Sequence, residues 1–299
     1  MRKQTGKTEM IKLSSVTLCA LLTLGATAAV ARDCGPDALG VSRTIAIGPK
    51  GTAVGLQSYP RTLDLQDHEV VLTFDDGPAE PTARVLDALA KECALATFFV
   101  IGRNAEETPA LVRREAAEGH SIGYHSYSHP ANTLRLMYDD AAKADIEKGV
   151  AAVEKASGGK SAPFFRFPGF ADTPELVSYL EGKGFTIFGS DLWASDWSPM
   201  APKAELDLVM SRLEKAGKGI VLFHDSKAQT AAMLPDFLTA LKSRGYKLVH
   251  IVPGAGETPV VDAGPDWTST TEPIIAKTLA GKVKGAAAGD GHGHSHGDQ

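Results

Sequence analysis

Residues 69–78 read EVVLTFDDGP. The run from Glu69 to Phe74 is mostly apolar and β-branched and stops at two acids, a glycine and a proline, which predicts a buried strand that ends in a turn. Asp75 and Asp76 therefore lie at the carboxyl end of a strand. Neighbouring residues that leave a strand point in different directions, so one carboxylate can bind a metal while the other handles a proton. Taken alone, the motif could also be a plain turn, because Asp, Gly and Pro are common turn residues.

A second motif, His125-Ser126-Tyr127-Ser128-His129, places two imidazoles four residues apart. Both can face one cation if the segment is helical or tightly turned. With Asp76 they would form a set of two histidines and one carboxylate, which leaves positions open for water and substrate as catalytic zinc sites do. Two surface histidines beside Pro130 are the structural alternative.

Three further motifs follow along the chain. They are Arg166-Phe167-Pro168-Gly169-Phe170, Asp191-Leu192-Trp193-Ala194-Ser195-Asp196-Trp197 and Leu222-Phe223-His224-Asp225. In order and wording, the five motifs resemble those of the polysaccharide deacetylases of carbohydrate esterase family 4, which share the NodB homology domain. The resemblance covers roughly residues 67–252. Each residue has an ordinary structural explanation when taken singly, but five motifs in one order argue against coincidence.

The resemblance implies that the first two motifs hold a base and a metal. It implies Asp75 as general base and one divalent metal bound by Asp76, His125 and His129. The metal in this family is usually zinc, and cobalt or another divalent ion also occurs. Hydrolysis of an N-acetyl group requires an activated water, stabilisation of the oxyanion and a proton for the departing amine.

The later motifs would hold the base and supply that proton. By resemblance, Arg166 holds the base, His224 is the general acid and Asp196 is the carboxylate that tunes this acid. The apolar run from Gly219 to Phe223 indicates a strand end before His224, where an imidazole can meet the other site residues. A neighbouring carboxylate raises the pKa of an imidazole by charge attraction, which keeps it protonated.

Departures from the family pattern bear on the substrate. Tyr124 precedes the first histidine, where many members carry Asn, and its phenol is expected near the site. Gly169 occupies the position whose backbone N–H would serve the oxyanion, and a backbone donor survives any side-chain change except proline. Trp193 stands where an acid is often found and offers a stacking face for a sugar. With Phe170 and Trp197 it is expected to line the substrate site.

Length and composition agree with one sizeable enzyme domain. The chain has 299 residues, of which 43% are hydrophobic and 22% charged, with a net charge of -5. This is enough to bury the core of one α/β domain. No basic patch indicates nucleic acid as a partner. The resemblance implies an N-acetylated glycan as the partner, and a monomer is expected.

Strand and helix patterns alternate through the middle of the chain. Strands are expected at residues 69–74, 95–101, 185–189, 220–224 and 247–251, and helices at 81–92, 109–118, 137–157, 206–216 and 233–243. Repeated βα units imply a parallel sheet. Because the acids and His224 follow strand ends, we expect an α/β fold in the form of a distorted, incomplete (β/α) barrel with its site at the carboxyl-terminal mouth. The resemblance adds that the barrel is of the NodB type, with about seven parallel strands.

The first 31 residues predict a signal peptide. Basic residues precede an apolar stretch from Val16 to Leu24, and Ala29-Val30-Ala31 suits cleavage before Arg32. A retained anchor is the alternative, although the stretch is shorter than the roughly 20 residues that span a bilayer. A periplasmic or secreted protein without a stable membrane anchor after cleavage is therefore expected. Cys34 and Cys93 could pair in such an oxidising compartment, which the sequence alone leaves open.

The remaining segments flank the predicted domain of residues 67–252. Residues 32–66 are expected to be an N-terminal extension, and residues 253–299 a flexible C-terminal region with a His-rich end. Three alternating histidines in this end can bind metal weakly as an auxiliary site: His292, His294 and His296. A solubilising tail or a cloning remnant is the alternative.

The sequence thus predicts an exported, metal-dependent hydrolase that removes N-acetyl groups from a chitin-like glycan, peptidoglycan or an exopolysaccharide. One alternative is an O-acetyl esterase acting on xylan-like glycans, since an alkoxide leaves more easily than an amine. Another is a non-catalytic protein that binds glycan or metal. Asp75 and His224 argue against the last, because a binding module needs neither base nor acid.

Overall fold

Strand β4 (Glu69–Asp75) lies at the centre of a parallel sheet in the computed structural model, which describes Met1 and residues 34–131 and 133–289. All seven residues of the strand are buried, as in parallel strands that are covered on both faces. Val70, Leu72 and Phe74 pack in a cluster with helix residues, whereas Val71 packs with residues of other strands. Because successive side chains alternate in direction, Asp75 continues the row of Val71 on the inner face of the sheet.

The main sheet is curved into an arc. Its order is β1-β11-β4-β5-β6-β7-β8-β2, and β10 pairs with both β4 and β9. The other strands of the described residues are β1 (Arg43–Ile47), β2 (Ala53–Val54), β3 (Arg61–Leu63), β5 (Thr97–Val100), β6 (Ser121–Tyr124), β7 (Phe164–Phe165), β8 (Thr186–Phe188), β9 (Leu192–Trp193), β10 (Gly219–His224), β11 (Lys247–Pro253) and β12 (Val260–Asp262). All pairs in the main sheet are parallel.

The arc is an incomplete barrel. The strands β9-β10-β4-β5-β6-β7-β8 follow one another around it, and no pairing between β8 and β9 closes it within the residues that the structure describes. The predicted distorted (β/α) barrel with about seven parallel strands is therefore confirmed. The strands run in one direction, so their carboxyl ends meet at a single mouth.

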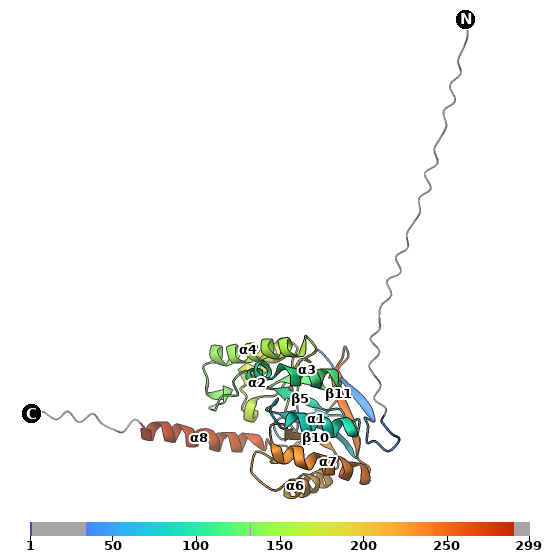
Figure 1. The fold of residues 1–299 in the computed structure, drawn as a ribbon. Helices are drawn as coiled ribbons and strands as arrows, with labels where there is room; N and C mark the ends of the chain where they lie inside the picture. Colours follow the sequence, from blue (N-terminus) through green and yellow to red (C-terminus); the bar gives the residue numbers. More distant parts are fainter. Residues whose placement is uncertain (2–33, 132, 290–299) are drawn as a thin grey trace, which may run out of the picture. The chain divides into compact units, whose positions relative to one another are not determined.

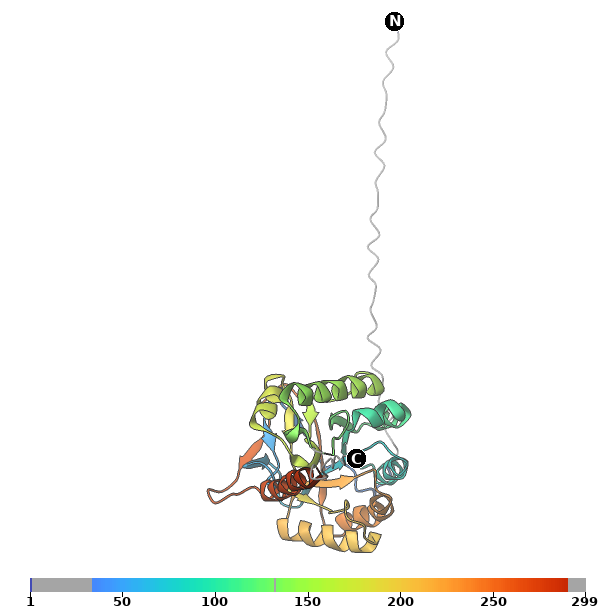
Figure 2. The ribbon, with the colours of Figure 1, turned by 90° about the vertical axis from the view of Figure 1, so that its left-hand side faces the viewer.

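Helices cover the outer face of the arc (Figure 1). They are α1 (Thr82–Lys91), α2 (Gly102–Glu107), α3 (Pro109–Ala117), α4 (Asp139–Ser157), α5 (Pro174–Gly182), α6 (Pro202–Ala216) and α7 (Ala228–Ser243). Helix α8 (Thr271–Gly289) does not cover this face but runs away from the barrel (Figure 1). Two short 3-10 turns are η1 (Leu134–Leu136) and η2 (Pro168–Phe170). Both views place α4 on the opposite side of the sheet from α6 (Figures 1 and 2). None of the helices in the described part of the chain is long and apolar enough to cross a membrane.

The folded unit is larger than the domain expected from sequence. Residues 43–63, expected as an extension, supply β1, β2 and β3, and β1 pairs with β11 while β2 pairs with β8. Residues 253–289, expected to be flexible, contain β12, which pairs antiparallel with β3, and helix α8. Both segments gain order by pairing with distant strands, which a local pattern of Pro, Gly and Thr does not reveal. The expected signal peptide and His292, His294 and His296 lie outside the described residues.

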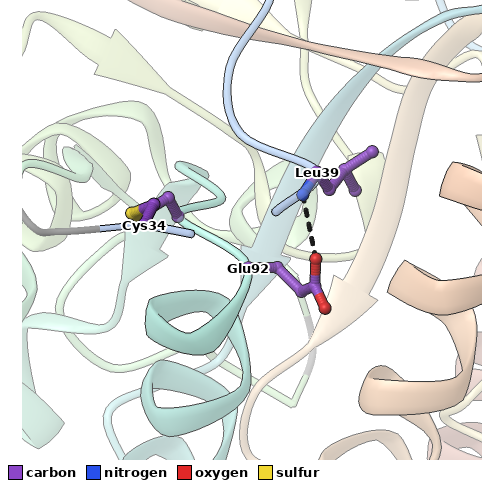
Figure 3. The surroundings of a disulfide bond; sticks show 4 residues. Cys34, Leu39 and Glu92 are labelled. Carbon is purple, nitrogen blue, oxygen red and sulfur yellow. Dashed lines mark hydrogen bonds between the residues drawn. A yellow bond between two sulfur atoms is a disulfide. The ribbon is translucent and has the colours of Figure 1, made fainter. Parts of the chain in front are cut away.

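Cys34 and Cys93 form a disulfide, which answers the question that the sequence left open. Their Cα atoms are 6.0 Å apart, within the usual range for a disulfide. Beside the bond, the backbone N–H of Leu39 donates a hydrogen bond to Glu92 at 2.9 Å (Figure 3). The bond therefore fastens the start of the folded unit to the end of α1.

Replacing Cys93 with Ser should lower the free energy of unfolding by about 2–4 kcal/mol, because the crosslink restricts the unfolded chain. Urea denaturation of both proteins under non-reducing conditions measures the difference. Reduced wild-type protein is the control and should unfold as the variant does. A difference that persists after reduction would mean that the serine, and not the loss of the crosslink, is responsible.

Candidate active site

Strand alternation brings the predicted residues together at the mouth of the barrel. His224 on β10 lies in register beside Asp75 on β4. Tyr124 on β6 lies beside Phe165 on β7, so the residues that follow them, His125 and Arg166, are also neighbours. A cavity of about 320 Å³ opens here. It is lined by Asp75, Asp76, His125, His129, Phe167, Gly169, Phe170, Trp193, Trp197, Leu222, His224, Thr271, Ile274 and Ile275.

Arg166 holds Asp75 from inside the barrel. Its guanidinium is fully buried and donates to Asp75 Oδ1 at 2.7 Å through Nη1. The same Nη1 donates to Thr73 Oγ1 at 2.9 Å, and Nη2 donates to the carbonyl of Gly189 at 2.7 Å. Burial lowers the pKa of Arg166, and the charge of Asp75 opposes that effect. The ion pair leaves Asp75 Oδ2 on the side of His125, 3.8 Å from its Nε2.

Asp76, His125 and His129 converge on one point. Their potential ligand atoms all lie within 4.8 Å of one another. Asp76 Oδ1 lies 3.5 Å from His125 Nε2 and 3.3 Å from His129 Nε2. Asp76 takes a left-handed backbone conformation with φ 71°, which turns its side chain away from that of Asp75. Both acids lie near His125, but only Asp75 pairs with Arg166 and only Asp76 lies near His129.

The histidine segment is a tight turn and not a helix. Ser126 and His129 have positive φ values of 61° and 46°, and the N–H of His129 donates to Ser126 Oγ at 3.0 Å. Helix α4 reaches this turn closely, because a Cβ on Gly149 would lie 2.5 Å from the carbonyl carbon of Ser126. Glycine is therefore required at this position of α4 for the helix to support the turn.

His125 is oriented by the backbone of Arg166. Its Nδ1 lies 2.7 Å from the carbonyl oxygen of Arg166. A carbonyl oxygen can only accept, so Nδ1 carries a proton, and Nε2 is the ring nitrogen that faces Asp76 and can bind a metal. Metal-binding histidines are commonly held in this way.

The three residues fit a divalent metal. Asp76 Oδ1 is buried and, among the described residues, has no hydrogen-bond donor. Burial would raise the pKa of Asp76, but the neighbouring histidines lower it, so the carboxyl is ionised. Burial and the charge of His125 lower the pKa of His129, which favours its neutral form. An ionised carboxylate and neutral imidazoles are the forms that bind metal.

His224 is paired with Asp196. Its Nδ1 donates to Asp196 Oδ1 at 2.8 Å, and its backbone N–H donates to Asp196 Oδ2 at 2.6 Å. Burial by itself would lower the pKa of His224, but the hydrogen bond and charge of Asp196, together with Asp76 and Asp75, raise it to about 9. The imidazole is therefore protonated at neutral pH, with Nε2 toward the cavity, 3.8 Å from Asp76 Oδ2.

Two residues that sequence reasoning missed support Asp196. Thr230 on α7 donates to Asp196 Oδ2 at 2.7 Å and lies 3.0 Å from Glu205 on α6. Glu205 is fully buried, and burial, with the charge of Asp196, raises its pKa to about 7. Neither residue belongs to a motif. The only sequence signal was a polar residue on the inner side of each amphipathic helix.

Three of the four predicted substrate residues line the cavity. The rings of Phe170, Trp193, Trp197 and His224 form a row, with successive centroids 6.2, 5.7 and 6.1 Å apart. Gly169 also lies at the cavity, in the left-handed region with φ 61°. Phe170, Trp193 and Trp197 are the apolar part of this row, on which a sugar ring can stack.

Tyr124, the fourth predicted substrate residue, is not at the site. It is 3% exposed, and its phenol donates to Ser161 Oγ at 2.7 Å. Burial raises the pKa of this phenol to about 12. Tyr124 and His125 are consecutive at the end of β6, so when the histidine points into the mouth the tyrosine points to the helices. The prediction was wrong because it ignored this alternation.

A wall of the cavity comes from outside every motif. Thr271, Ile274 and Ile275 belong to α8, in the region that was expected to be flexible. Phe167 and Leu222, which lie within motifs but had no predicted role, also line the cavity. The Thr271 to Ile275 segment carries no pattern that would place it beside residues more than 40 positions earlier.

The comparisons with known proteins agree on one family for this barrel and its cavity. The sequence model of the polysaccharide deacetylase family matches residues 63–188. Chitin deacetylase of Colletotrichum lindemuthianum is 32% identical over 64% of this chain and 80% of its own length. The chain therefore belongs to the polysaccharide deacetylase family.

Two bacterial proteins give the same result. A peptidoglycan-N-acetylglucosamine deacetylase of Bacillus cereus is 33% identical over 59% of this chain. The solved structure of a Bdellovibrio bacteriovorus peptidoglycan deacetylase is 31% identical over 77% of this chain, with a TM-score of 0.63. The chain spans 66% of the Bacillus protein and 61% of the Bdellovibrio chain, so it covers neither of them whole.

Proposed function

We propose that the chain is an exported, metal-dependent deacetylase that hydrolyses the N-acetyl groups of a glycan. The observation that carries this proposal is the placement of Asp75 and His224 on adjacent strands, on either side of the candidate metal ligand Asp76. The carboxylate of Asp75 is paired with the buried guanidinium of Arg166. The imidazolium of His224 is paired with the buried carboxylate of Asp196. Such a pair can take a proton from water and return one to an amine.

Asp75 is the proposed general base. Arg166 occupies Oδ1, so Oδ2 is the oxygen that can accept a proton from water in the cavity. Arg166 also fixes the carboxylate in one orientation, since its other hydrogen bonds anchor it to the carbonyls of Phe188 and Gly189. A positioned base within reach of its proton is the first requirement of general base catalysis.

His224 is the proposed general acid. Its Nδ1–H is engaged by Asp196, so the proton that it can give to the leaving nitrogen is the one on Nε2, which faces the cavity. Asp196 in turn accepts from Thr230 and from the backbone of His224, so its charge stays in place during the transfer. Transfer of this proton from His224 to the nitrogen makes the amine a viable leaving group.

Asp76, His125 and His129 are the proposed ligands of one divalent metal, with zinc as the expected ion. When bound, such an ion polarises the substrate carbonyl and lowers the pKa of water, from about 15.7 to about 7 in the best-known case. The backbone N–H of Gly169 is proposed as a further donor to the oxyanion. Phe170, Trp193 and Trp197 would stack on the sugar.

Replacing Asp196 with Asn should move the alkaline limb of the pH–rate profile to lower pH by about 1–3 pH units. His224 must be protonated to act as an acid, so activity falls as pH rises through its pKa. Asp196 raises that pKa, and its removal lets burial lower it. The profile of kcat, measured with saturating zinc, gives the shift.

The control is Asp207→Asn, which removes an exposed carboxylate on α6 that pairs with Lys203. Its profile should match that of the wild-type protein. If the Asp196→Asn profile also overlays the wild-type profile while its rate falls, Asp196 acts on the fold and not on the proton of His224.

Acetate release tests the proposed function. Mature protein is chelated and then assayed on chitooligosaccharides, peptidoglycan and acetylated xylan, with and without added zinc or cobalt. Zinc-restored release from an N-acetylated glycan is the expected result. Release from xylan alone would favour the O-acetyl esterase, and no release from any glycan by metal-loaded protein would favour a binding protein.

The remaining assignments complete the proposal. Residues 1–31 act as a signal peptide, and the mature protein is a periplasmic or secreted monomer. His292, His294 and His296 form an auxiliary weak metal site. The absence of Lys and Arg from the described cavity lining supports a neutral N-acetylated sugar over a strongly anionic one.

A further inference from the structure

The first turn of α8 forms part of the cavity wall. Thr271, Ile274 and Ile275 lie there with the aromatic residues and the proposed base and acid. Helix α8 begins well beyond residue 188, where the match to the family ends. In Figure 1 helix α8 runs away from the barrel, and the inner end of the helix lies next to the barrel. The cleft of this chain therefore includes a wall that comes from outside the five motifs.

Several contacts fix the start of α8. Glu272 accepts two hydrogen bonds from Arg135, at 2.8 and 2.9 Å. Arg135 also donates to the carbonyl of Asp172 at 2.5 Å, so it ties α8 to the segment that follows η2. The N–H groups of Thr270 and Thr271 both donate to the carbonyl of Gln57, at 2.8 and 3.0 Å. A wall held at this many points is preorganised to contact a ligand.

The two isoleucines of this turn differ in exposure. Ile275 is 6% exposed and packs inward, whereas Ile274 is 54% exposed although it is large and apolar. Both line the same cavity. Ile275 is therefore suited to anchor the turn, and Ile274 presents apolar surface to the cleft that a ligand there would cover.

Ile274 lies away from the reacting centre. The aromatic row starts at His224 and ends at Phe170, and α8 packs against η2, which carries Phe170. The cavity volume of about 320 Å³ is at the small end of ligand pockets, so a polymeric substrate must extend past it. A sugar that runs along the row beyond the reacting ring would reach Ile274.

We propose that Ile274 is a specificity-determining residue that packs against a sugar ring neighbouring the one that loses its acetyl group. The inference rests on the proposed deacetylase function and adds a subsite to it. The ligand is a β-linked N-acetylglucosamine chain, whose ring faces are apolar enough to stack against an aliphatic side chain. The contact stabilises ground state and transition state alike, so it acts on KM.

The test is Ile274→Ala, assayed by acetate release from the disaccharide, trisaccharide and tetrasaccharide of N-acetylglucosamine. For the longer substrates KM should rise roughly fivefold, with kcat within about twofold of the wild-type value. The smallest substrate that does not reach α8 should show no change. Ile274→Leu, which keeps the apolar surface, should restore KM.

Lys277→Ala is the matched control, since Lys277 is exposed in the next turn of α8 and does not line the cavity. It should behave as the wild-type protein does. Equal KM values for Ile274→Ala and wild type at every length would overturn the subsite while leaving the deacetylase intact. No acetate release by zinc-loaded wild-type protein from these oligosaccharides, peptidoglycan or acetylated xylan would instead overturn the proposed function, so the two failures are distinguishable. A thermal unfolding curve checks that the exposed substitution leaves the fold unchanged.

Discussion

Asp75→Asn should lower kcat by about 10²–10⁴-fold while the protein keeps its bound metal. The amide has the shape of the carboxylate and still accepts from Arg166 through its oxygen, but it cannot take a proton from water. The proposed ligands Asp76, His125 and His129 are unchanged. Acetate release and elemental analysis of the same preparation measure the two effects together.

The substitution also removes the charge that pairs with a fully buried cation. Breaking a buried ion pair is destabilising, so the melting temperature should fall, and rates must be measured well below it. Asp191→Asn is the matched control. Asp191 is a partly buried carboxylate that accepts from the N–H groups of Leu56 and Ile220 and does not line the cavity. It should lose stability and retain kcat, and an equal loss of kcat in both variants would show that destabilisation is the cause.

His125→Ala should remove the metal and reduce acetate release on the order of 10³-fold, because Lewis-acid assistance is worth several kcal/mol. The change deletes one of three ligands and also leaves the carbonyl of Arg166 without its donor. Metal content per chain, measured after dialysis, should fall toward background. Added zinc should restore activity to chelated wild-type protein but not to the variant.

His68→Ala controls for the loss of a histidine. His68 is partly exposed, pairs with Asp67 and lies outside the cavity. Metal content and activity should be unchanged in this variant. If His125→Ala retains metal and loses activity, His125 acts on the substrate or on Asp75, and the proposed ligand set is wrong.

The core of the fold could be predicted because its strands carry the signal themselves. Glu69 to Phe74 and Ile220 to His224 are long apolar runs with polar residues at their ends, and the structure has strands there. In long helices such as α4, apolar residues recur with the period of a helix. Since parallel strands end at one mouth, the meeting of Asp75 with His224 also followed from these runs.

Other strands could not be found in this way. β7 and β9 have two residues each, too few to show a period, and they exist because neighbouring strands offer hydrogen-bond partners. β6 (Ser121–Tyr124) mixes a serine, a glycine and a tyrosine, so its composition does not indicate a strand. Because β6 was not predicted, the alternation of side chains at its end was not applied to Tyr124, and the direction of this side chain was predicted wrongly.

The site was predicted from motifs, and its surroundings were not. Asp196 and His224 belong to motifs, but Thr230 and Glu205 behind them are single polar residues on long helices. The wall formed by α8 follows β12 in the chain, and β12 is placed by its antiparallel pairing with the distant strand β3. Such contacts are set by tertiary structure, which spacing along the sequence does not encode.

Arg166 joins two parts of the site that are usually considered separately. Its side chain holds Asp75, and its own carbonyl holds His125. A displacement of β7 by a fraction of an ångström would therefore be transmitted to the proton acceptor and to a metal ligand at once. Directed evolution toward a different metal ion should for this reason find few substitutions at β7 that retain kcat. Substitutions around His129, which shares the turn with His125 but is not hydrogen-bonded to Arg166 among the described contacts, leave that linkage untouched and offer the more independent route.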